Sequence, residues 1–255
     1  KMLNYVEYGK ENKYDDDIFF QKYSQMSRSQ QGLAGAGEWE TLRKLLPDFK
    51  DKRVLDLGCG YGWHCIYAME HGASSVVGVD ISHKMLEVAK EKTHFPQVEY
   101  KCCAIEDVEF PEESFDVILS SLAFHYVADY EILVKKIYRI LKSGGNLVFT
   151  VEHPVFTAYG TQDWYYNKKG EILHFPVDNY YYEGKRTAVF LEEKVTKYHR
   201  TLTTYLNTLL SNGFIINHIV EPQPPEYMMD IPGMQDEMRR PMMLIVSANK
   251  NCYTT

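Results

Sequence analysis

The 255-residue sequence lacks any run of eighteen apolar residues, so no helix is expected to span a membrane. It also lacks an excess of basic side chains, since 35 acidic residues outnumber 28 lysines and arginines and give a formal net charge of −7. Binding to a nucleic-acid backbone needs a basic stripe on the protein surface. Neither a nucleic acid nor a membrane is therefore the expected partner.

Cysteine is scarce, and its five copies do not have the spacing of a zinc site, so no metal is expected. The adjacent pair Cys102-Cys103 is typical of small apolar side chains packed at the end of a strand. The odd number of cysteines, with no secretory pattern at the start of the sequence, favours free thiols in a reducing compartment. We therefore expect a cytoplasmic protein.

What the sequence does contain is a regular alternation of short apolar runs and helical patterns. Strands are expected at 54–57, 75–79, 98–103, 115–120, 146–151, 214–220 and 242–248, and helices at 63–70, after Ser82, at 129–141 and at 202–210. This alternation predicts an α/β fold with a Rossmann-like, doubly wound, mainly parallel seven-stranded sheet. Such a sheet binds its ligand at the carboxyl ends of the strands.

Residues 1–49 precede this alternation and are expected to form a helical lid, with residues 50–255 as the main domain. The spacing of apolar residues predicts one helix over 15–31. The small-residue segment 32–37 then provides a hinge, and a short helix over 39–46 ends before Pro47. Two interpretations stay open, a lid over the ligand and ordinary packing at the domain edge.

The strongest motif is a glycine-rich turn after the first strand, where Gly58, Gly60 and Gly62 alternate behind Asp56. Glycine allows close approach of the backbone to a ligand, and the turn opens a helix whose free N–H groups face the site. Asp80 ends the second strand, where an acid can accept both hydroxyl groups of a ribose. Together these features predict a site for a nucleoside cofactor.

The spacing of the glycines separates two such cofactors. A dinucleotide site has its third glycine where this chain has Trp63. The run 58–62 instead resembles motif I of the class I S-adenosylmethionine-dependent methyltransferases. The resemblance continues through the segments 80–85, 103–111, 114–118 and 141–145 and covers residues 50–152, with Ala104 where the family commonly has aspartate.

This resemblance implies a small-molecule methyltransferase that uses S-adenosylmethionine and releases S-adenosylhomocysteine. It also implies an N-terminal segment that closes over the cofactor, with Tyr23 over the methionine part and Arg28 near its carboxylate. The implied cofactor contacts are Tyr23, Met26, Arg28, Asp56, Gly58, Cys59, Gly60, Asp80, Ile81, Met85, Ala104, Ile105, Glu106 and Ser120.

The family has no universal catalytic residue, because in-line displacement needs a base only when the acceptor must lose a proton. The Asn/Asp-Pro-Pro-aromatic signature of relatives that methylate exocyclic amines is missing, and residues 120–123 read Ser-Ser-Leu-Ala instead. We therefore expect a small-molecule acceptor. His125 and His153 are the candidate catalytic residues, and a structural role stays open for each.

Residues 153–199 interrupt the alternation and concentrate aromatic residues. The pattern around Glu183-Gly184-Lys185 predicts a β-hairpin formed by 177–182 and 186–191. Its rings are expected to cover an apolar or flat acceptor, or else to form a homodimer surface or pack on themselves. Two other functions also stay open: an S-adenosylmethionine sensor without turnover and a nicotinamide-dependent oxidoreductase.

Overall fold

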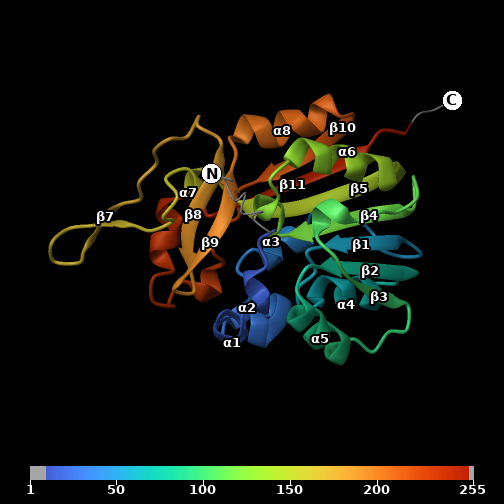
Figure 1. Ribbon diagram of the computed structural model, residues 1–255, viewed down its shortest axis with the longest axis horizontal. Coiled ribbons are helices and arrows are strands. Elements are labelled where there is room, and N and C mark those ends of the chain that lie inside the picture. Colours follow the sequence, from blue (N-terminus) through green and yellow to red (C-terminus); the bar gives the residue numbers. More distant parts are fainter. Residues whose placement is uncertain (1–9, 253–255) are drawn as a thin grey trace, which may run out of the picture.

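The computed structural model describes residues 10–252, so residues 1–9 of the expected lid lie outside the described part. A seven-stranded sheet forms the centre of the molecule (Figure 1). Its strands, in order across the sheet, are β10 (Phe214–Val220), β11 (Met243–Lys250), β5 (Leu141–Glu152), β4 (Phe115–Ser121), β1 (Arg53–Leu57), β2 (Ser75–Asp80) and β3 (Val98–Cys102). Only β11 runs antiparallel to its two neighbours in this sheet. The expected Rossmann-like, mainly parallel sheet is confirmed.

Helices cover both faces of the sheet. Successive strand residues point to opposite sides, so each strand contributes to the two cores that the helices close. Leu55 and Val77 lie in the core shared with α6 and α8, whereas Val54 and Val76 lie in the core shared with α3, α4 and α5. The helices are α1 (Asp17–Ser24), α2 (Ser27–Gln31), α3 (Trp39–Arg43), α4 (Trp63–Glu70), α5 (His83–Lys92), α6 (Tyr130–Ile140), α7 (Pro154–Thr157) and α8 (Leu202–Ser211). None of these helices is long and apolar enough to cross a membrane.

The N-terminal segment differs from the single helix expected at 15–31. It forms two helices, α1 and α2, separated at Gln25 and Met26. The backbone of Met26 is extended, and α2 begins at the next residue. The hydroxyl of Ser24 donates to the carbonyl of Gln21, a local bond that competes with continuing the helix. The helix expected at 39–46 is also shorter than predicted, since α3 ends at Arg43.

The β-hairpin of the insertion exists, but its expected position is wrong. The strands that pair are β8 (Gly184–Phe190) and β9 (Glu193–His199), with the turn at Leu191 and Glu192. Both turn residues have positive φ, as a tight two-residue hairpin turn requires. The sequence pattern places the turn at Gly184, whereas Gly184 begins β8. Residues 177–182 form no strand.

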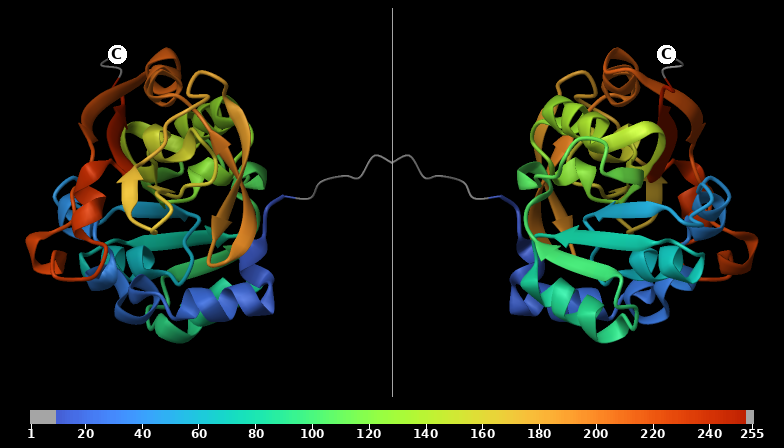
Figure 2. Two further views of the ribbon diagram at one scale, coloured as in Figure 1. Left: turned by 90° about the vertical axis from the view of Figure 1, so that its left-hand side faces the viewer. Right: turned by 90° about the vertical axis from the view of Figure 1, so that its right-hand side faces the viewer.

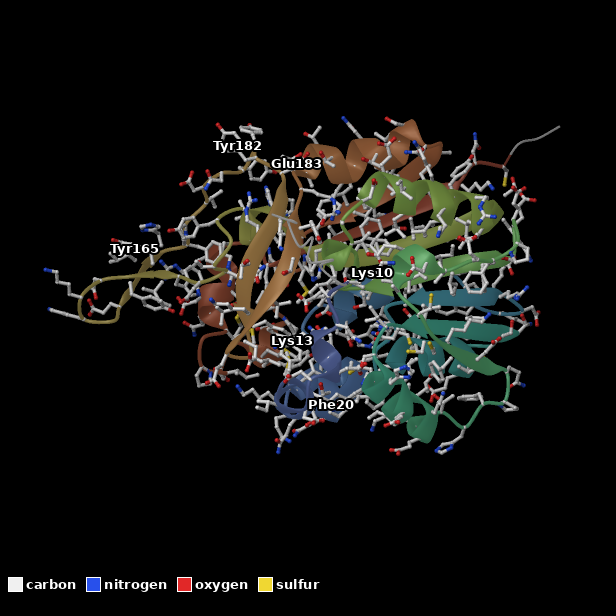
Figure 3. The ribbon with its side chains drawn as sticks, viewed as in Figure 1. Lys10, Lys13, Phe20, Tyr165, Tyr182 and Glu183 are labelled. Carbon is white, nitrogen blue, oxygen red and sulfur yellow. The ribbon has the colours of Figure 1, made fainter. Side chains whose placement is uncertain are left out.

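A second, smaller hairpin of β6 (Tyr165–Tyr166) and β7 (Ile172–His174) projects from the body of the molecule (Figures 1 and 3). Tyr165 is exposed on this arm. At the base of the arm, the guanidinium of Arg240 lies 4.8–5.0 Å from three ring centroids, those of Phe156, Trp164 and Phe175. Many aromatic side chains of the insertion 153–199 therefore pack around Arg240 or face solvent.

Candidate active site

One large cavity of about 250 Å³ lies at the carboxyl ends of β1, β2, β4 and β5, where the fold predicts a ligand. The N-terminal segment and the β8–β9 hairpin also contribute to its wall. The expected site residues that line it are Tyr23, Met26, Arg28, Gly58, Cys59, Gly60, Asp80, Ile81, Met85, Ala104, Ile105, Glu106 and His125. Residues far apart in the sequence are thus gathered around one space.

The glycine-rich turn between β1 and α4 forms the floor of the cavity. Gly58 has a φ of 76°, and a Cβ there would lie 2.5 Å from the Cβ of Ala123. The amides of Gly58 and Cys59 both donate to the carbonyl of Val79. A Cβ at Gly60 would lie 3.1 Å from the Cε of Met85. Side chains at the two glycines would therefore narrow the space between the turn and its neighbours.

Asp80 is fixed at the end of β2 by backbone donors. Its carboxylate accepts from the amides of Gly60 and Ser82, each at 2.9 Å. Burial raises the pKa of Asp80 in spite of these hydrogen bonds. A carboxylate has about four acceptor positions. Two remain for the hydroxyl groups of a ligand, and this is the role that an acid at the end of the second strand predicts.

Arg28 lies in the cavity wall but already has a partner. Its guanidinium makes two hydrogen bonds to the carboxylate of buried Glu38, both at 3.1 Å. The five N–H donors of arginine are not exhausted by two bonds. The sequence did not single out Glu38, because nothing in its local pattern marks it as a partner of Arg28.

The N-terminal segment is attached at both sides of the cavity. Glu11 accepts from the amide of Thr196 in β9 at 2.9 Å. Asp15 accepts from the hydroxyl of Ser82 at 2.6 Å and from the amide of Lys84 at 3.1 Å, at the start of α5. Figure 2 shows this segment (blue) beside the hairpin (orange), and Lys13 of the segment, labelled in Figure 3, pairs with Glu193 of β9 at 3.6 Å. The segment therefore bridges the hairpin and the sheet domain.

Three expected site residues do not line the cavity. The Ser120 hydroxyl donates to the carbonyl of Leu57 at 2.7 Å, because alternation along β4 turns it away and leaves the next residue, Ser121, at the cavity. Asp56 is buried, and burial raises its pKa to about 7. His153 accepts from the amide of Val155 through Nδ1 and contacts Glu221 through Nε2.

The end of the cavity near β4 and β5 holds a different set of groups. Buried His125 and Glu152 line it, and the hydroxyl groups of Tyr14 and Tyr126 lie 3.2 Å apart at its wall. Burial lowers the pKa of His125 to about 4. The nearby carboxylate of Glu152 acts in the opposite direction but does not outweigh burial. The sequence did not predict Tyr14 as a lining residue, since it belongs to no recognisable motif. Phe190 is the part of the expected aromatic cover that reaches the cavity.

The glycine-rich turn, the acid that ends β2 and the shared cavity define a nucleoside-cofactor site on a doubly wound sheet. A family model for a methyltransferase domain matches residues 55–149. Two solved structures are similar over most of the chain. The first, a Listeria monocytogenes protein assigned to the S-adenosylmethionine-dependent methyltransferases, is 57% identical with a TM-score of 0.83, over 86% of this chain and 99% of that one. The second, an S-adenosylmethionine-dependent methyltransferase from Mesorhizobium loti, is 40% identical with a TM-score of 0.80, over 86% of this chain and 100% of that one.

A ubiquinone biosynthesis O-methyltransferase from Coxiella burnetii is 35% identical over 112 residues, which are 43% of this chain and 47% of that enzyme. This similarity covers less than half of either chain, whereas the two solved structures match nearly from end to end. The chain belongs to the S-adenosylmethionine-dependent methyltransferases. Its cofactor is S-adenosylmethionine, and Asp80 and the two glycines of the floor fit the nucleoside of that cofactor.

Proposed function

We propose that this methyltransferase transfers the methyl group to a small molecule held between β4, β5 and the β8–β9 hairpin. The observation that carries the proposal is the set of aromatic side chains that line that end of the cavity. Tyr14, Tyr126 and Phe190 come from three separate segments of the chain and all line the same cavity. A cavity of about 250 Å³ with aromatic walls suits a small acceptor, whereas a base in a polymer needs a basic groove.

Two further observations support a small acceptor. The net charge of −7 disfavours a nucleic acid. The partial similarity to a ubiquinone biosynthesis O-methyltransferase is to an enzyme named for small-molecule biosynthesis. We extend only this broad class to the present chain.

We assign the cofactor to the β1–β2–β3 end of the cavity. Asp80 binds the ribose hydroxyl groups, and Ala104, Ile105 and Glu106 border the adenine. Tyr23 and Met26 cover the methionine part, and Arg28 reaches its carboxylate through N–H groups that Glu38 leaves open. When bound, the cofactor supplies an electrophilic methyl group on a sulfonium. The protein residues then hold donor and acceptor in line, an effect worth up to about 7–11 kcal/mol of the barrier.

The N-terminal segment and the insertion serve as covers in this proposal. The lid is the N-terminal segment, expected at 1–49. Glu11 holds it against β9 of the hairpin, and Asp15 holds it against Ser82 at the start of α5. Within the insertion 153–199, the β8–β9 hairpin is the acceptor cover, since it carries Phe190. The β6–β7 arm is left outside this role because its tyrosines are exposed.

The test is to supply methyl-labelled S-adenosylmethionine and the purified protein to a cell extract separated into small-molecule, protein and nucleic-acid fractions. We expect a labelled compound in the small-molecule fraction that chromatography separates from S-adenosylmethionine and that forms in amounts that depend on the protein. The matched control is Asp80→Asn, which should reduce that label strongly. Label confined to the protein or nucleic-acid fraction would contradict a small acceptor.

A further inference from the structure

A cluster of polar side chains lies at the acceptor end of the cavity. Lys197 in β9 and Glu152 at the end of β5 are both buried and form an ion pair. The ammonium group of Lys197 also donates to the side-chain oxygen of Gln162 at 2.9 Å, and the amide of Gln162 donates to Glu152. Glu152 faces the cavity, whereas Lys197 and Gln162 do not line it. The insertion thus supplies both partners of a carboxylate that faces the acceptor end.

Glu152 is held in its charged form. Burial alone would raise its pKa, but the neighbouring His125 and Lys197 and the hydrogen bond from Gln162 outweigh burial and lower the pKa. A carboxylate has about four acceptor positions, and two are used by Lys197 and Gln162. Glu152 can therefore accept a further hydrogen bond from a molecule in the cavity.

His125 is less suited to accept a proton from that molecule. Its Nδ1 accepts from the backbone amide of Glu152 at 3.4 Å, so the proton of the neutral ring is on Nε2. Nε2 lies 3.6 Å from the carboxylate of Glu152. Both ring nitrogens are thus directed at Glu152, and neither presents a lone pair to the cavity.

The charge at this end also restricts the acceptor. Lys197 lies 5.3 Å from the ring centroid of Phe190 and 5.9 Å from that of Tyr126. The aromatic faces that would attract a cationic acceptor therefore already face an ammonium group. An anionic acceptor would instead meet the charged Glu152. A neutral molecule avoids both repulsions, and near neutral pH a hydroxyl is uncharged where an aliphatic amine or a carboxylic acid is not.

We propose that the acceptor is a neutral hydroxyl compound with an aromatic or apolar body, whose hydroxyl donates to Glu152. This inference rests on the proposed function. As the acceptor oxygen forms its bond to the methyl carbon, the carbon–sulfur bond breaks and the hydroxyl proton passes to Glu152. The products are a methyl ether and S-adenosylhomocysteine, whose sulfur is now a neutral thioether, and Glu152 then returns its proton to solvent.

The test compares three probes that share one ring but differ in charge: 4-methylphenol, benzylamine and benzoate. Their binding to protein saturated with S-adenosylhomocysteine is measured by ligand-observed NMR. We expect 4-methylphenol to bind at least about tenfold more tightly than the two charged probes. Glu152→Gln should weaken 4-methylphenol about tenfold, because a charged hydrogen-bond acceptor becomes a neutral one. Lys197→Met leaves Glu152 without its cationic partner and should shift the preference towards benzylamine.

Glu221→Gln is the matched control, since it also removes a carboxylate from a histidine partner but lies outside the cavity. It should leave the binding of all three probes unchanged. Calorimetry with S-adenosylhomocysteine verifies that each variant is folded. Absence of 4-methylphenol binding to the wild type, tighter binding of a charged probe, or an unchanged Glu152→Gln variant would each overturn the inference. Failure of the proposed function is separate, because it would appear as label in a macromolecular fraction.

Discussion

We propose Asp80 as the residue on which cofactor binding depends most directly. Its carboxylate is oriented by two backbone amides and faces the cavity. Replacing Asp80 with asparagine keeps the size of the side chain but removes its charge and one acceptor oxygen. We expect S-adenosylhomocysteine to bind about ten- to a hundredfold more weakly, which corresponds to about 1.4–3 kcal/mol. Isothermal titration calorimetry measures this difference.

The control for this variant is Asp116→Asn. Asp116 also accepts from a backbone amide, that of Arg53 at 2.8 Å, but it is not a cavity residue. Its replacement should leave the affinity for S-adenosylhomocysteine within error. Equal losses in the two variants would mean that Asp80 acts through stability and not through contact with the cofactor.

Gly58 is constrained both by its backbone and by its surroundings, and a pair of variants separates the two. Gly58 and Gly170 both have positive φ, but an added Cβ meets Ala123 at 2.5 Å in the first case and nothing within 4 Å in the second. Gly170→Ala should cost about 1 kcal/mol for backbone strain alone. Gly58→Ala should cost a further 1–3 kcal/mol or so for overpacking and should also weaken cofactor binding. Urea denaturation gives both values, and equal values would show that the turn relaxes around the new methyl group.

At the scale of elements, the start of α5 is joined to the N-terminal segment that we propose as a lid. Asp15 accepts from the hydroxyl of Ser82 and from the first amides of this helix. Asp15→Ala should therefore cost about 1 kcal/mol in the free energy of unfolding, as the loss of a capping residue does. It should also increase the dissociation rate of S-adenosylhomocysteine, because the proposed lid is then released at one end. Stopped-flow displacement measures this rate.

Asp129→Ala provides the comparison for Asp15. Asp129 caps α6 by accepting from the amide of Ile132 and lies away from the cavity. Its loss should cost a similar free energy of unfolding without changing the dissociation rate. If both variants released the ligand equally fast, the bond between Asp15 and α5 would not be what retains the lid.

The elements that could be predicted from the sequence are those whose side chains carry a period. Each strand of the central sheet agrees with its expected range within a few residues, apart from β5, whose start at Leu141 lies before the expected 146. The inner strands β1, β2 and β4 give continuous apolar runs because they are buried on both faces. The β8–β9 turn could not be predicted, since Leu191 and Glu192 adopt positive φ without glycine or asparagine. The break between α1 and α2 at Met26 could not be predicted either, because the spacing of apolar residues continues across it.

The same distinction applies to the site. Gly58, Gly60 and Asp80 follow adjacent strands, so their meeting could be predicted from topology. The contact of Glu152 with Lys197 joins residues 45 positions apart. It depends on how the hairpin lies against β5, and no local period records that packing. Tyr14 reached the cavity for the same reason, through tertiary contacts of a segment with no motif.

At the scale of the whole molecule, buried ionisable groups make stability depend on pH in opposite directions. The pKa of His125 falls to about 4, so the folded protein excludes a proton that the unfolded chain takes up below about pH 6.5. The stabilisation from neutral His125 is complete above that value and is lost as the pH falls towards 4. The pKa of Asp56 rises to about 7, so its contribution is complete below about pH 3.8 and is lost as the pH rises through 7. The two effects partly cancel in the wild type.

A variant at His125 removes one side of this balance. With His125→Asn, the free energy of unfolding should fall less steeply between pH 6.5 and 4 than it does in the wild type. The difference between the two proteins should change by up to about 1.4 kcal/mol per pH unit, to a limit of about 3 kcal/mol. Urea denaturation at intervals of half a pH unit or so measures both curves, with His174→Asn, which removes an exposed ring, as the control. Parallel curves for His125→Asn and the wild type would mean that the folded protein accepts a proton at His125, and the two ring nitrogens would then not both be committed to Glu152.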